Sequence, residues 1–561
     1  MLLLTKEAMN INSELYMSFD NFYTYDELTE FLKSANTQFP DFTNLESIGK
    51  SYEGRDIWAL TITNYSSGHP EDKPAMYIDG NIHAGEVTGC AVCMYTMQYL
   101  LNNYGDDDLV THLMDTRTFY ILPRVNPDGA EVYLTSPETL RSSVRPNPEF
   151  EWKDNHLYRE DVNGDGKILN MRIEDPAGPY KISAEDERVM IPREPDEFGG
   201  TYYSLYPEGK VHSYDGGPIE VGPRRYHLDI NRNFPADWKP TQSGAGRYPL
   251  SEPETRAMVD FILEHDNIAT LQAYHTFAGI ILRPSCTRPD SDMDTLDVRA
   301  FETIGQRGTD LTDYPVKSVF HGFTRDQGQP RHGVFIDWIY EHLGILGYST
   351  ELWDKYSKAD IDREYGKPLT EEQHAKLYQW HDAEELDAFH DWESFEHPQL
   401  GEVEIGGFST KTFRQNTPFK YLEEECHNNT IFSLRQAAAT PILQIENVNV
   451  TEKTSGLVAV EVVVKNSGFL PTNITNQALR QDAVEPIKAV IKSEDVEVLG
   501  GEAEQELGQI EGYMEAKLNM RSGPVKNRKQ VSWLVDPKDS ENLTVVVKSD
   551  RAGTDQVTIK L

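Results

Sequence analysis

The sequence has few cysteines and no long apolar run. Its four cysteines among 561 residues are too few for a disulfide framework. Cys90 and Cys93 have CxxC spacing, but they lie in the apolar stretch 88–94, where small buried residues explain them better than a redox or metal pair. A signal peptide and a run of about 18 apolar residues are both missing, so we expect a cytoplasmic protein that does not enter a membrane.

Positive charge is also scarce. Lys and Arg total 53 against 92 Asp and Glu, which gives a formal net charge of -39. This excess repels the phosphates of nucleic acids, so we expect no nucleic-acid partner. It favours solubility and cation binding, and it fits both an ordinary acidic soluble protein and adaptation to a salty habitat.

Helix-like and strand-like segments alternate over residues 18–125 and again over 227–355. Such alternation predicts an α/β domain, a sheet covered by helices. Residues 136–226 interrupt it with a long ordered insertion that is rich in Pro, Gly, Asp, Glu and Tyr. A charged stretch with Trp380, Trp392 and His397 follows the second alternating region. The prediction is an amino-terminal extension (1–17) and an α/β domain (18–415) that contains the insertion.

The last part of the chain differs in composition. The stretches 457–465 and 543–548 are rich in β-branched residues and are separated by turn residues. Several short strands at this spacing predict a small β-sandwich at residues 440–561. No residue pattern in it indicates a binding site, so its role stays open, as does the oligomeric state.

The most informative motif is His83-Ala84-Gly85-Glu86, which separates a strand-like run from a helical pattern. A His and a Glu three residues apart project from one side of a helical turn and can bind the same ion. With one distant His they would make the open, three-ligand zinc site of a hydrolase. The strand-like run 268–275 ends in such a residue, His275. On its own, HxxE is too short to exclude an ordinary solvated turn.

Further motifs lie in a fixed order along the chain, at residues 126–129 (Asn-Pro-Asp-Gly), 229–234 (Asp-Ile-Asn-Arg-Asn-Phe), 251–255 (Ser-Glu-Pro-Glu-Thr), 337–338 (Asp-Trp) and 347–352 (Gly-Tyr-Ser-Thr-Glu-Leu). Together with HxxE and His275, this order resembles the zinc carboxypeptidases of the carboxypeptidase A/B family over roughly residues 18–400. The resemblance implies a mixed β-sheet flanked by helices. It also implies a metallocarboxypeptidase, whose substrate is a peptide with a free C-terminal carboxylate.

The resemblance implies a role for each residue of the metal centre. His83, Glu86 and His275 would bind one zinc ion, and Asp229 would accept a hydrogen bond from His83 and orient its ring. Glu351 would be the general base that takes a proton from the attacking water and passes it to the departing amine.

Substrate-binding roles follow in the same way. Asn231 and Arg232 would bind the terminal carboxylate, because the planar guanidinium grips a carboxylate at two points; the alternative for Arg232 is a core salt bridge. Arg141, with Arg145 as the second choice, would stabilise the oxyanion. Ile336 would favour neutral or hydrophobic C-terminal residues.

Two positions depart from the family pattern. The family's mobile tyrosine should stand shortly before Asp337, but residues 327–333 contain no tyrosine. The best-known digestive members carry a substrate-binding arginine where this chain has Gly85. In addition, Arg331 and His332 could face the specificity pocket, where they would favour an acidic substrate.

Residues 161–168 resemble the start of an EF-hand calcium loop. Asp161, Asn163, Asp165 and the carbonyl of Lys167 would supply oxygen ligands, with Glu174 or Asp175 in place of the usual closing glutamate. A plain Asx/Gly turn explains the same residues equally well.

Two alternatives to a carboxypeptidase remain at this stage. One is an amidase or endopeptidase that acts on cell-wall or γ-linked peptides. The other is a non-catalytic binding module on a peptidase fold, against which the retention of Glu351 and all three zinc ligands argues.

Overall fold

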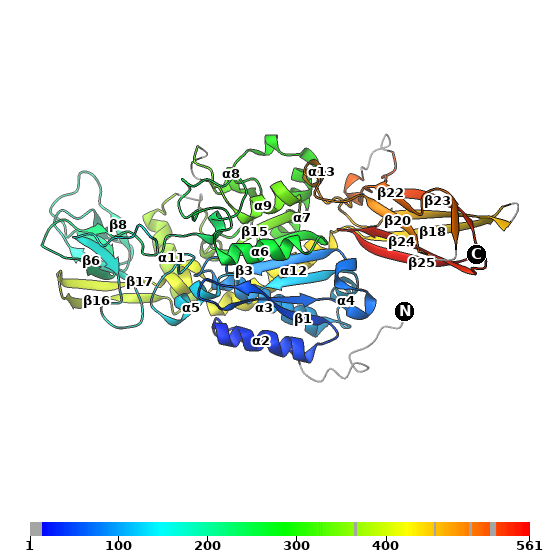
Figure 1. The fold of residues 1–561 in the computed structure, drawn as a ribbon. Coiled ribbons are helices and arrows are strands. Elements are labelled where there is room, and N and C mark those ends of the chain that lie inside the picture. Colours follow the sequence, from blue (N-terminus) through cyan, green and yellow to red (C-terminus); the bar gives the residue numbers. More distant parts are fainter. Residues whose placement is uncertain are drawn as a thin grey trace.

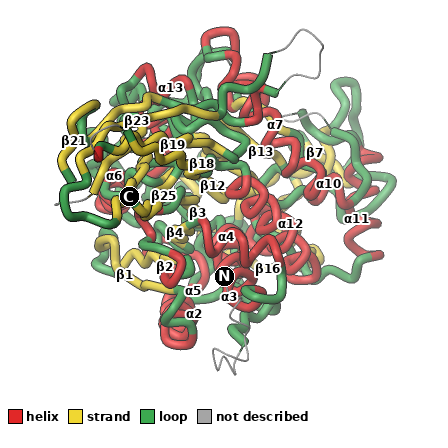
Figure 2. The backbone as a smooth tube through the Cα atoms, turned by 90° about the vertical axis from the view of Figure 1, so that its right-hand side faces the viewer, coloured by secondary structure: helices red, strands yellow, loops and turns green. Residues whose placement is uncertain are grey.

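A computed structural model describes residues 14–324, 326, 328–363, 367–453, 456–492, 496–516 and 523–561. A small β lobe, a central α/β core and a β-sandwich follow one another from left to right in Figure 1. Figure 2 views the molecule from the sandwich end. Residues 1–13 of the predicted extension lie outside the described residues. Leu15 and Met17 are buried, and their backbone N–H groups donate to the side chains of Asn102 and Gln98 at 3.0 and 2.7 Å.

The core is built on an eight-stranded sheet in the order β1-β2-β4-β3-β12-β15-β13-β14. The neighbours β4, β3, β12 and β15 run parallel, whereas β1, β2 and β13 pair antiparallel to their inner neighbours. This is the mixed sheet that the resemblance implied, and that prediction is confirmed. The strands are β1 (Thr43–Lys50), β2 (Asp56–Ile62), β3 (Ala75–Gly80), β4 (Thr118–Leu122), β12 (Ile268–Thr276), β13 (Ile280–Arg283), β14 (Val316–Ser318) and β15 (Leu346–Leu352).

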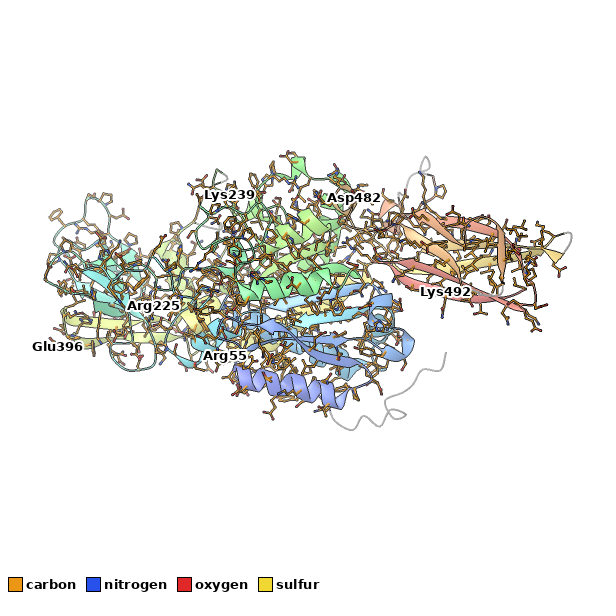
Figure 3. All side chains as sticks on the ribbon, viewed as in Figure 1. Arg55, Arg225, Lys239, Glu396, Asp482 and Lys492 are labelled. Atoms are coloured by element: carbon orange, nitrogen blue, oxygen red, sulfur yellow. The ribbon has the colours of Figure 1, made fainter. Side chains whose placement is uncertain are left out.

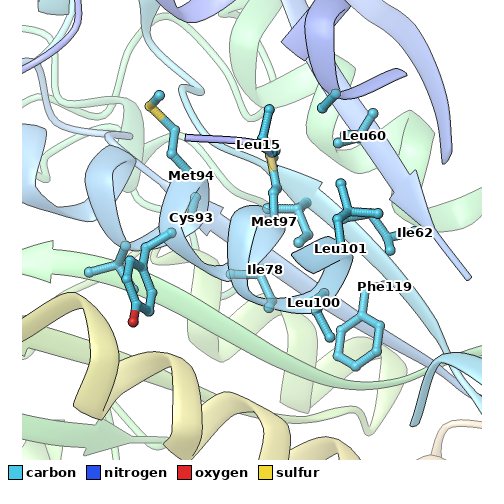
Figure 4. Packing of buried hydrophobic residues seen from close by; sticks show 14 of the residues in the cluster. Leu15, Leu60, Ile62, Ile78, Cys93, Met94, Met97, Leu100, Leu101 and Phe119 are labelled. Atoms are coloured by element: carbon cyan, nitrogen blue, oxygen red, sulfur yellow. The ribbon is translucent and has the colours of Figure 1, made fainter. Parts of the chain in front are cut away.

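Alternate residues of the central strands enter two different hydrophobic clusters. Met76 and Ile78 of β3 join one cluster, and Ala75 and Tyr77 join the other, because successive side chains of a strand point to opposite faces. Figure 4 shows the first cluster, in which Ile78 and Phe119 meet α3. Its helices are α2 (Tyr25–Gln38), α3 (Val87–Asn103), α4 (Asp108–Thr116) and α12 (Phe419–Ala438); the longer helices of the second are α6 (Pro253–Leu263) and α9 (Phe335–Leu343).

The remaining helices of the core are shorter or lie towards its ends. They are α5 (Pro127–Thr135), α7 (Thr295–Thr312), α8 (Val319–Gly322), α10 (Lys355–Lys358) and α11 (Glu371–Ala383). None of the helices in the described parts of the chain is both long and apolar enough to cross a membrane. The four cysteines are buried free thiols, Cys90 and Cys93 among them.

The lobe is assembled from two distant parts of the chain. Its larger sheet has the order β16-β17-β6-β9-β7-β8, and its smaller one β10-β5-β11. Seven strands come from the predicted insertion: β5 (His156–Arg159), β6 (Asn170–Glu174), β7 (Tyr180–Ile182), β8 (Met190–Pro192), β9 (Tyr203–Pro207), β10 (Gly209–Val211) and β11 (Glu220–Val221). The other two, β16 (Phe389–His397) and β17 (Gly401–Phe408), form a hairpin whose β17 pairs with β6.

This hairpin was not evident from the sequence. It contains Trp392 and His397, and most residues of β16 are exposed or only partly buried, so the apolar alternation of a typical strand is missing. The Arg172 guanidinium of β6 binds Glu404 of β17 through two hydrogen bonds of 2.8 and 3.0 Å. In Figure 3, the labelled Glu396 lies at the far end of the hairpin, and the labelled Arg225 lies on the side of the lobe next to the core.

The carboxy-terminal part is a sandwich of two four-stranded sheets, as predicted. One has the order β18-β19-β23-β21 and the other β22-β20-β24-β25. Buried Val, Ile and Leu residues of both sheets form one cluster around Trp533. The strands are β18 (Leu443–Glu452), β19 (Val458–Asn466), β20 (Ile487–Lys492), β21 (Glu497–Gly500), β22 (Glu504–Gly508), β23 (Arg528–Asp536), β24 (Asn542–Ser549) and β25 (Gly553–Lys560).

The sandwich is joined to the core by buried polar contacts. Asp297 of α7 accepts the backbone N–H groups of Asn476 and Gln477, at 2.7 and 3.0 Å, where α13 (Asn476–Arg480) begins. Thr475 donates to the carbonyl of Gly344 at 2.6 Å. These bonds satisfy backbone groups that would otherwise be buried without a partner.

One close approach determines how α3 sits on the sheet. A Cβ atom on Gly80, the last residue of β3, would lie 2.6 Å from the carbonyl carbon and oxygen of Gly89 in α3. The end of β3 can approach the start of α3 this closely only because Gly80 has no side chain, and Gly89 in turn lies close to Tyr274 of β12. The segment between them, residues 81–86, contains the HxxE motif.

Gly80→Ala should therefore destabilise the protein by about 1–3 kcal/mol, the usual cost of overpacking a well-packed interior. The clash is with backbone atoms, which cannot move aside as a flexible side chain can. Equilibrium denaturation followed by tryptophan fluorescence measures the effect. Gly523→Ala is the matched control, because no atom lies within 4 Å of the added methyl group. Equal stability of the two variants would contradict the packing argument.

Candidate metal centre and active site

The HxxE motif forms a loop between β3 and α3. Glu86 is the N-cap residue of α3, so the His and the Glu lie on the turn before the helix and not within it. Asn81 has a left-handed backbone (φ 60°), and its side-chain amide donates to the carbonyls of His83 and Ala84 at 2.7 and 3.1 Å. These bonds hold the loop in the shape that turns both side chains to the same side.

His275 meets this loop from the neighbouring strand. It lies near the end of β12, which pairs in parallel with β3, so the ends of both strands are at one edge of the sheet. The Nδ1 atoms of His83 and His275 are 3.1 Å apart. The two carboxylate oxygens of Glu86 lie 2.9 Å from Nδ1 of His83 and 3.0 Å from Nδ1 of His275.

These three buried residues fit a divalent cation. Their ligand atoms all lie within 4.8 Å of one another. Two ring nitrogens and one carboxylate are a donor set that zinc takes in catalytic sites. A cation also resolves the contact between the two Nδ1 atoms, since both can then present a lone pair to the same ion.

Asp229 contacts the ring of His83. Its Oδ1 lies 3.1 Å from Nε2 of His83, on the side of the ring away from Glu86. Burial opposes the charge of this carboxylate, but the Arg141 guanidinium and the His83 ring hold the pKa of Asp229 well below its usual range. An ionised Asp229 orients the ring and leaves Nδ1 facing the other two ligands.

Glu351 lies directly across from His275. The two residues are paired in the register of β12 and β15, so the carboxylate faces the same space as the ligand cluster. Burial and the negative charge of Glu86 raise the pKa of Glu351. No hydrogen bond from another described residue ties down the Glu351 carboxylate, which leaves it available to a molecule in the cleft.

Arg141 and Arg145 occupy different surroundings. Arg141 donates to Glu86 at 2.8 Å and to Asp229 at 3.4 Å, and it lines the cleft. Arg145 pairs with Glu252 at 2.6 Å and stacks on Tyr52, and it is not among the residues that line the cleft. The structure thus brings the first-choice arginine to the ligand cluster and holds the second choice away from it.

Asn231 and Arg232 also line the cleft, on a short 3-10 helix (Ile230–Arg232) that Asp229 caps. The Asn231 side-chain oxygen accepts the backbone N–H of Phe335 at 2.8 Å. Arg232 donates to the carbonyl of Asn231, and no described carboxylate forms an ion pair with it. This speaks against the core salt bridge considered from the sequence.

One cavity of about 600 Å³, which we call the central cavity, is lined by His83, Glu86, His275, Arg141, Asn231, Arg232 and Glu351. Beyond Arg232 its walls are mainly apolar. Ile336 lies there on α9, together with Leu282, Val319, Phe323 and Val334. Arg331 also lines the cavity, and its guanidinium lies 4.4 Å from the Phe323 ring centroid and donates to the Phe323 carbonyl. His332 turns elsewhere and bonds with Asp237 at 2.8 Å.

Sequence reasoning missed several residues of the cavity. Thr276 and Phe277 follow His275 directly, and this adjacency was the one signal that could have found them. Arg363 and Lys367 line the cavity from the segment after α10, where no motif marks them. Gln327, within the stretch that lacks the family's tyrosine, lies outside the described residues. A side chain on Gly85 would meet Tyr133 and Gln415 at 2.7 and 2.8 Å, so these residues fill the space beside it.

The loop 161–167 lies in the lobe, on the connection from β5 to β6. Asp161 accepts the backbone N–H groups of Gly164 and Gly166, Asn163 that of Asp165, and Asp165 that of Lys167. Asp175, a candidate closing ligand, instead accepts from Ser204 and from the backbone of Ala177. These bonds make a series of Asx turns, and calcium at this loop stays a prediction.

The chain is similar in sequence to known carboxypeptidases. Residues 28–376 match the family model of zinc carboxypeptidases, and residues 442–560 match a domain of unknown function (DUF8731). Carboxypeptidase A2 of Rattus norvegicus is 24% identical over 346 residues, which cover 60% of this chain and 64% of that protein. Carboxypeptidase B of Astacus astacus is 23% identical over 352 residues, covering 60% of this chain and 88% of that protein.

Among solved structures, thrombin activatable fibrinolysis inhibitor is 17% identical, with a TM-score of 0.45, and the match covers 78% of this chain and 79% of that one. The match to carboxypeptidase A2 spans less than two thirds of that relative's length. The family model, however, covers more than half of this chain and includes all three candidate ligands and Glu351. The chain therefore belongs to the zinc carboxypeptidase family.

Proposed function

We propose that this chain is a zinc-dependent metallocarboxypeptidase that removes the C-terminal residue from peptides with a free terminal carboxylate. One observation carries the proposal. The central cavity contains a cluster of three residues that could hold a metal ion, a carboxylate suited to proton transfer, and Arg232, which forms no ion pair with a described carboxylate. A cavity of this size accommodates one amino-acid side chain beside the reacting bond.

Each residue has a part in this reaction. His83, Glu86 and His275 would hold zinc, which when bound acts as a Lewis acid towards the scissile carbonyl and makes water more acidic. Glu351 would take the proton of the attacking water and deliver it to the leaving amine. Arg141 would stabilise the negative charge that develops on the carbonyl oxygen, held in position by Glu86 and Asp229.

Specificity would come from the other end of the cavity. Asn231 and Arg232 would hold the terminal carboxylate, and the terminal side chain would extend towards Ile336. The apolar walls favour neutral or hydrophobic residues. We expect Arg331 not to favour acidic C-terminal residues, because its guanidinium is already stacked on the Phe323 ring and donates to the Phe323 carbonyl.

Zinc binding should depend on all three ligands. His275→Ala should remove most of the bound zinc and leave the circular dichroism spectrum nearly unchanged, since two ligands cannot replace three. Elemental analysis of the purified protein measures the metal. His265→Ala, a histidine that packs on Tyr120 and Phe261 away from the cavity, should keep a full complement. Full zinc content in the His275→Ala protein would show that this ligand is misassigned.

Glu351→Gln should retain zinc and lower the rate of peptide hydrolysis by about 10²–10⁴-fold, the usual contribution of a general base. The amide has nearly the same shape as the carboxylate but cannot accept the proton. The rate is measured by release of the terminal residue. Glu396→Gln, at the far end of the lobe, is the control and should behave as wild type. Turnover by Glu351→Gln close to the wild-type rate would refute the proposed mechanism.

Arg232→Ala should abolish the preference for free over amidated C-termini. An amidated peptide offers no carboxylate, so it loses little when the guanidinium is removed, whereas a free peptide loses a charge-assisted bidentate contact. Mass spectrometry of paired peptides gives both rates, and Arg307→Ala, an exposed arginine of α7, is the control. Wild-type protein that cleaves both forms equally, or cuts internally, would favour the amidase or endopeptidase alternative.

A further inference from the structure

A second cavity continues the central one where the lobe meets the core. It measures about 210 Å³, and both cavities are lined by Arg141 and Phe277. Asn231, Arg232 and Ile336 line the central cavity but not this one. If the terminal carboxylate is bound at Arg232, the second cavity therefore lies on the side of the scissile bond where the preceding residues of a peptide must leave.

The walls of this cavity are cationic. Besides Arg141 they contain Arg159 of the lobe, Arg224 from the end of the insertion and Arg414 of the core, and we call the cavity the arginine pocket. None of its described lining residues is Asp or Glu. Within the described parts of the chain, Arg159, Arg224 and Arg414 form no ion pair, although Glu138 interacts electrostatically with Arg159 from a longer distance. In a chain with a net charge of -39, such a gathering is unexpected for an ordinary surface.

The same positive field extends around Phe277. The buried Lys355 Nζ lies 5.2 Å from the ring centroid of Phe277, and the Arg414 guanidinium lies 5.8 Å from it. Burial and the charges of Arg414 and Arg363 lower the pKa of Lys355 to about 7. Partial burial and the charges of Arg159, Arg141 and Arg414 lower the pKa of Arg224. These cations repel one another, and an anion between them would relieve the repulsion.

We propose that the arginine pocket binds acidic side chains of the substrate, Glu or Asp, at positions upstream of the scissile bond. This rests on the proposed function for the direction in which the peptide lies. Arg159, Arg224 and Arg414 are exposed residues that line the pocket, so they can reach a ligand, and the planar fork of a guanidinium matches a carboxylate. A cavity of about 210 Å³ admits one or two side chains and is too small for a folded domain or a nucleic-acid duplex.

The inference gives the lobe a role in the reaction. Arg159 stands at the end of β5 and Arg224 shortly after β11, so with Arg141 three of the four arginines come from the inserted segment 136–226. The lobe would then extend the substrate-binding surface beyond the metal centre. The apolar walls around Ile336 still select the C-terminal residue. The favoured peptide therefore has Glu or Asp upstream of the scissile bond and a neutral residue at its C-terminus.

The test compares two fluorescent peptides, Glu-Glu-Glu-Ala-Phe and Gln-Gln-Gln-Ala-Phe. In both, the last peptide bond is reduced to CH2–NH, so that they bind without being hydrolysed. Fluorescence anisotropy with the zinc-loaded wild-type protein should give a Kd about tenfold lower for the acidic peptide at low ionic strength. The ratio should fall as salt is added, because exposed charges are screened.

Arg224→Gln combined with Arg414→Gln should bring the ratio of the two Kd values close to one. A control with Arg307→Gln, which removes an exposed positive charge from α7, should keep the wild-type ratio. Equal affinities in the wild-type protein, or an unchanged ratio in the double variant, would overturn the proposal.

A parallel assay with the unreduced peptides separates this proposal from the proposed function. Release of Phe from both peptides with equal affinity of the reduced forms leaves the carboxypeptidase standing and refutes the acidic subsite. Selective binding of the acidic peptide without release of Phe from either one supports the subsite and refutes the carboxypeptidase.

Discussion

The parallel pairing of β3, β12 and β15 is the constraint on which the site depends. It brings the loop after β3, His275 near the end of β12 and Glu351 on β15 to one edge of the sheet, although they are far apart in the sequence. Side chains at the carboxyl ends of adjacent parallel strands are natural neighbours, which is why open α/β sheets bind ligands there. The glycine contact between β3 and α3 then fixes where the loop must lie.

Charge is distributed unevenly over this framework. The chain as a whole is strongly acidic, yet arginines line both the central cavity and the arginine pocket. A cleft of one sign in a surface of the other concentrates oppositely charged ligands and excludes those of like charge. Positive charge does not dominate next to the three candidate ligands, because the carboxylates of Glu86 and Asp229 bind the Arg141 guanidinium and offset its charge.

The parts of the molecule that could be predicted from the sequence are those marked by a pattern of neighbouring residues. The central strands are apolar runs, and the three residues that the structure brings together as a candidate metal centre lie in short motifs whose order resembles a family. The hairpin β16–β17 gave no such signal, since its residues are half exposed and its stability comes from pairing with distant β6. The arginine pocket was also hidden, because Arg159, Arg224 and Arg414 lie far apart in the sequence and only the tertiary fold brings them together.

The way the lobe is assembled also affects how the protein is made. Arg172 of β6 and its partner Glu404 of β17 are separated by 232 residues. On the ribosome, the inserted strands emerge long before the hairpin that completes their sheet, so β6 has an open edge while most of the core is being synthesised. An open strand edge is a template for unwanted pairing. The short, polar strands of the lobe reduce that hazard, and the lobe is completed only after the residues of the metal centre have been translated.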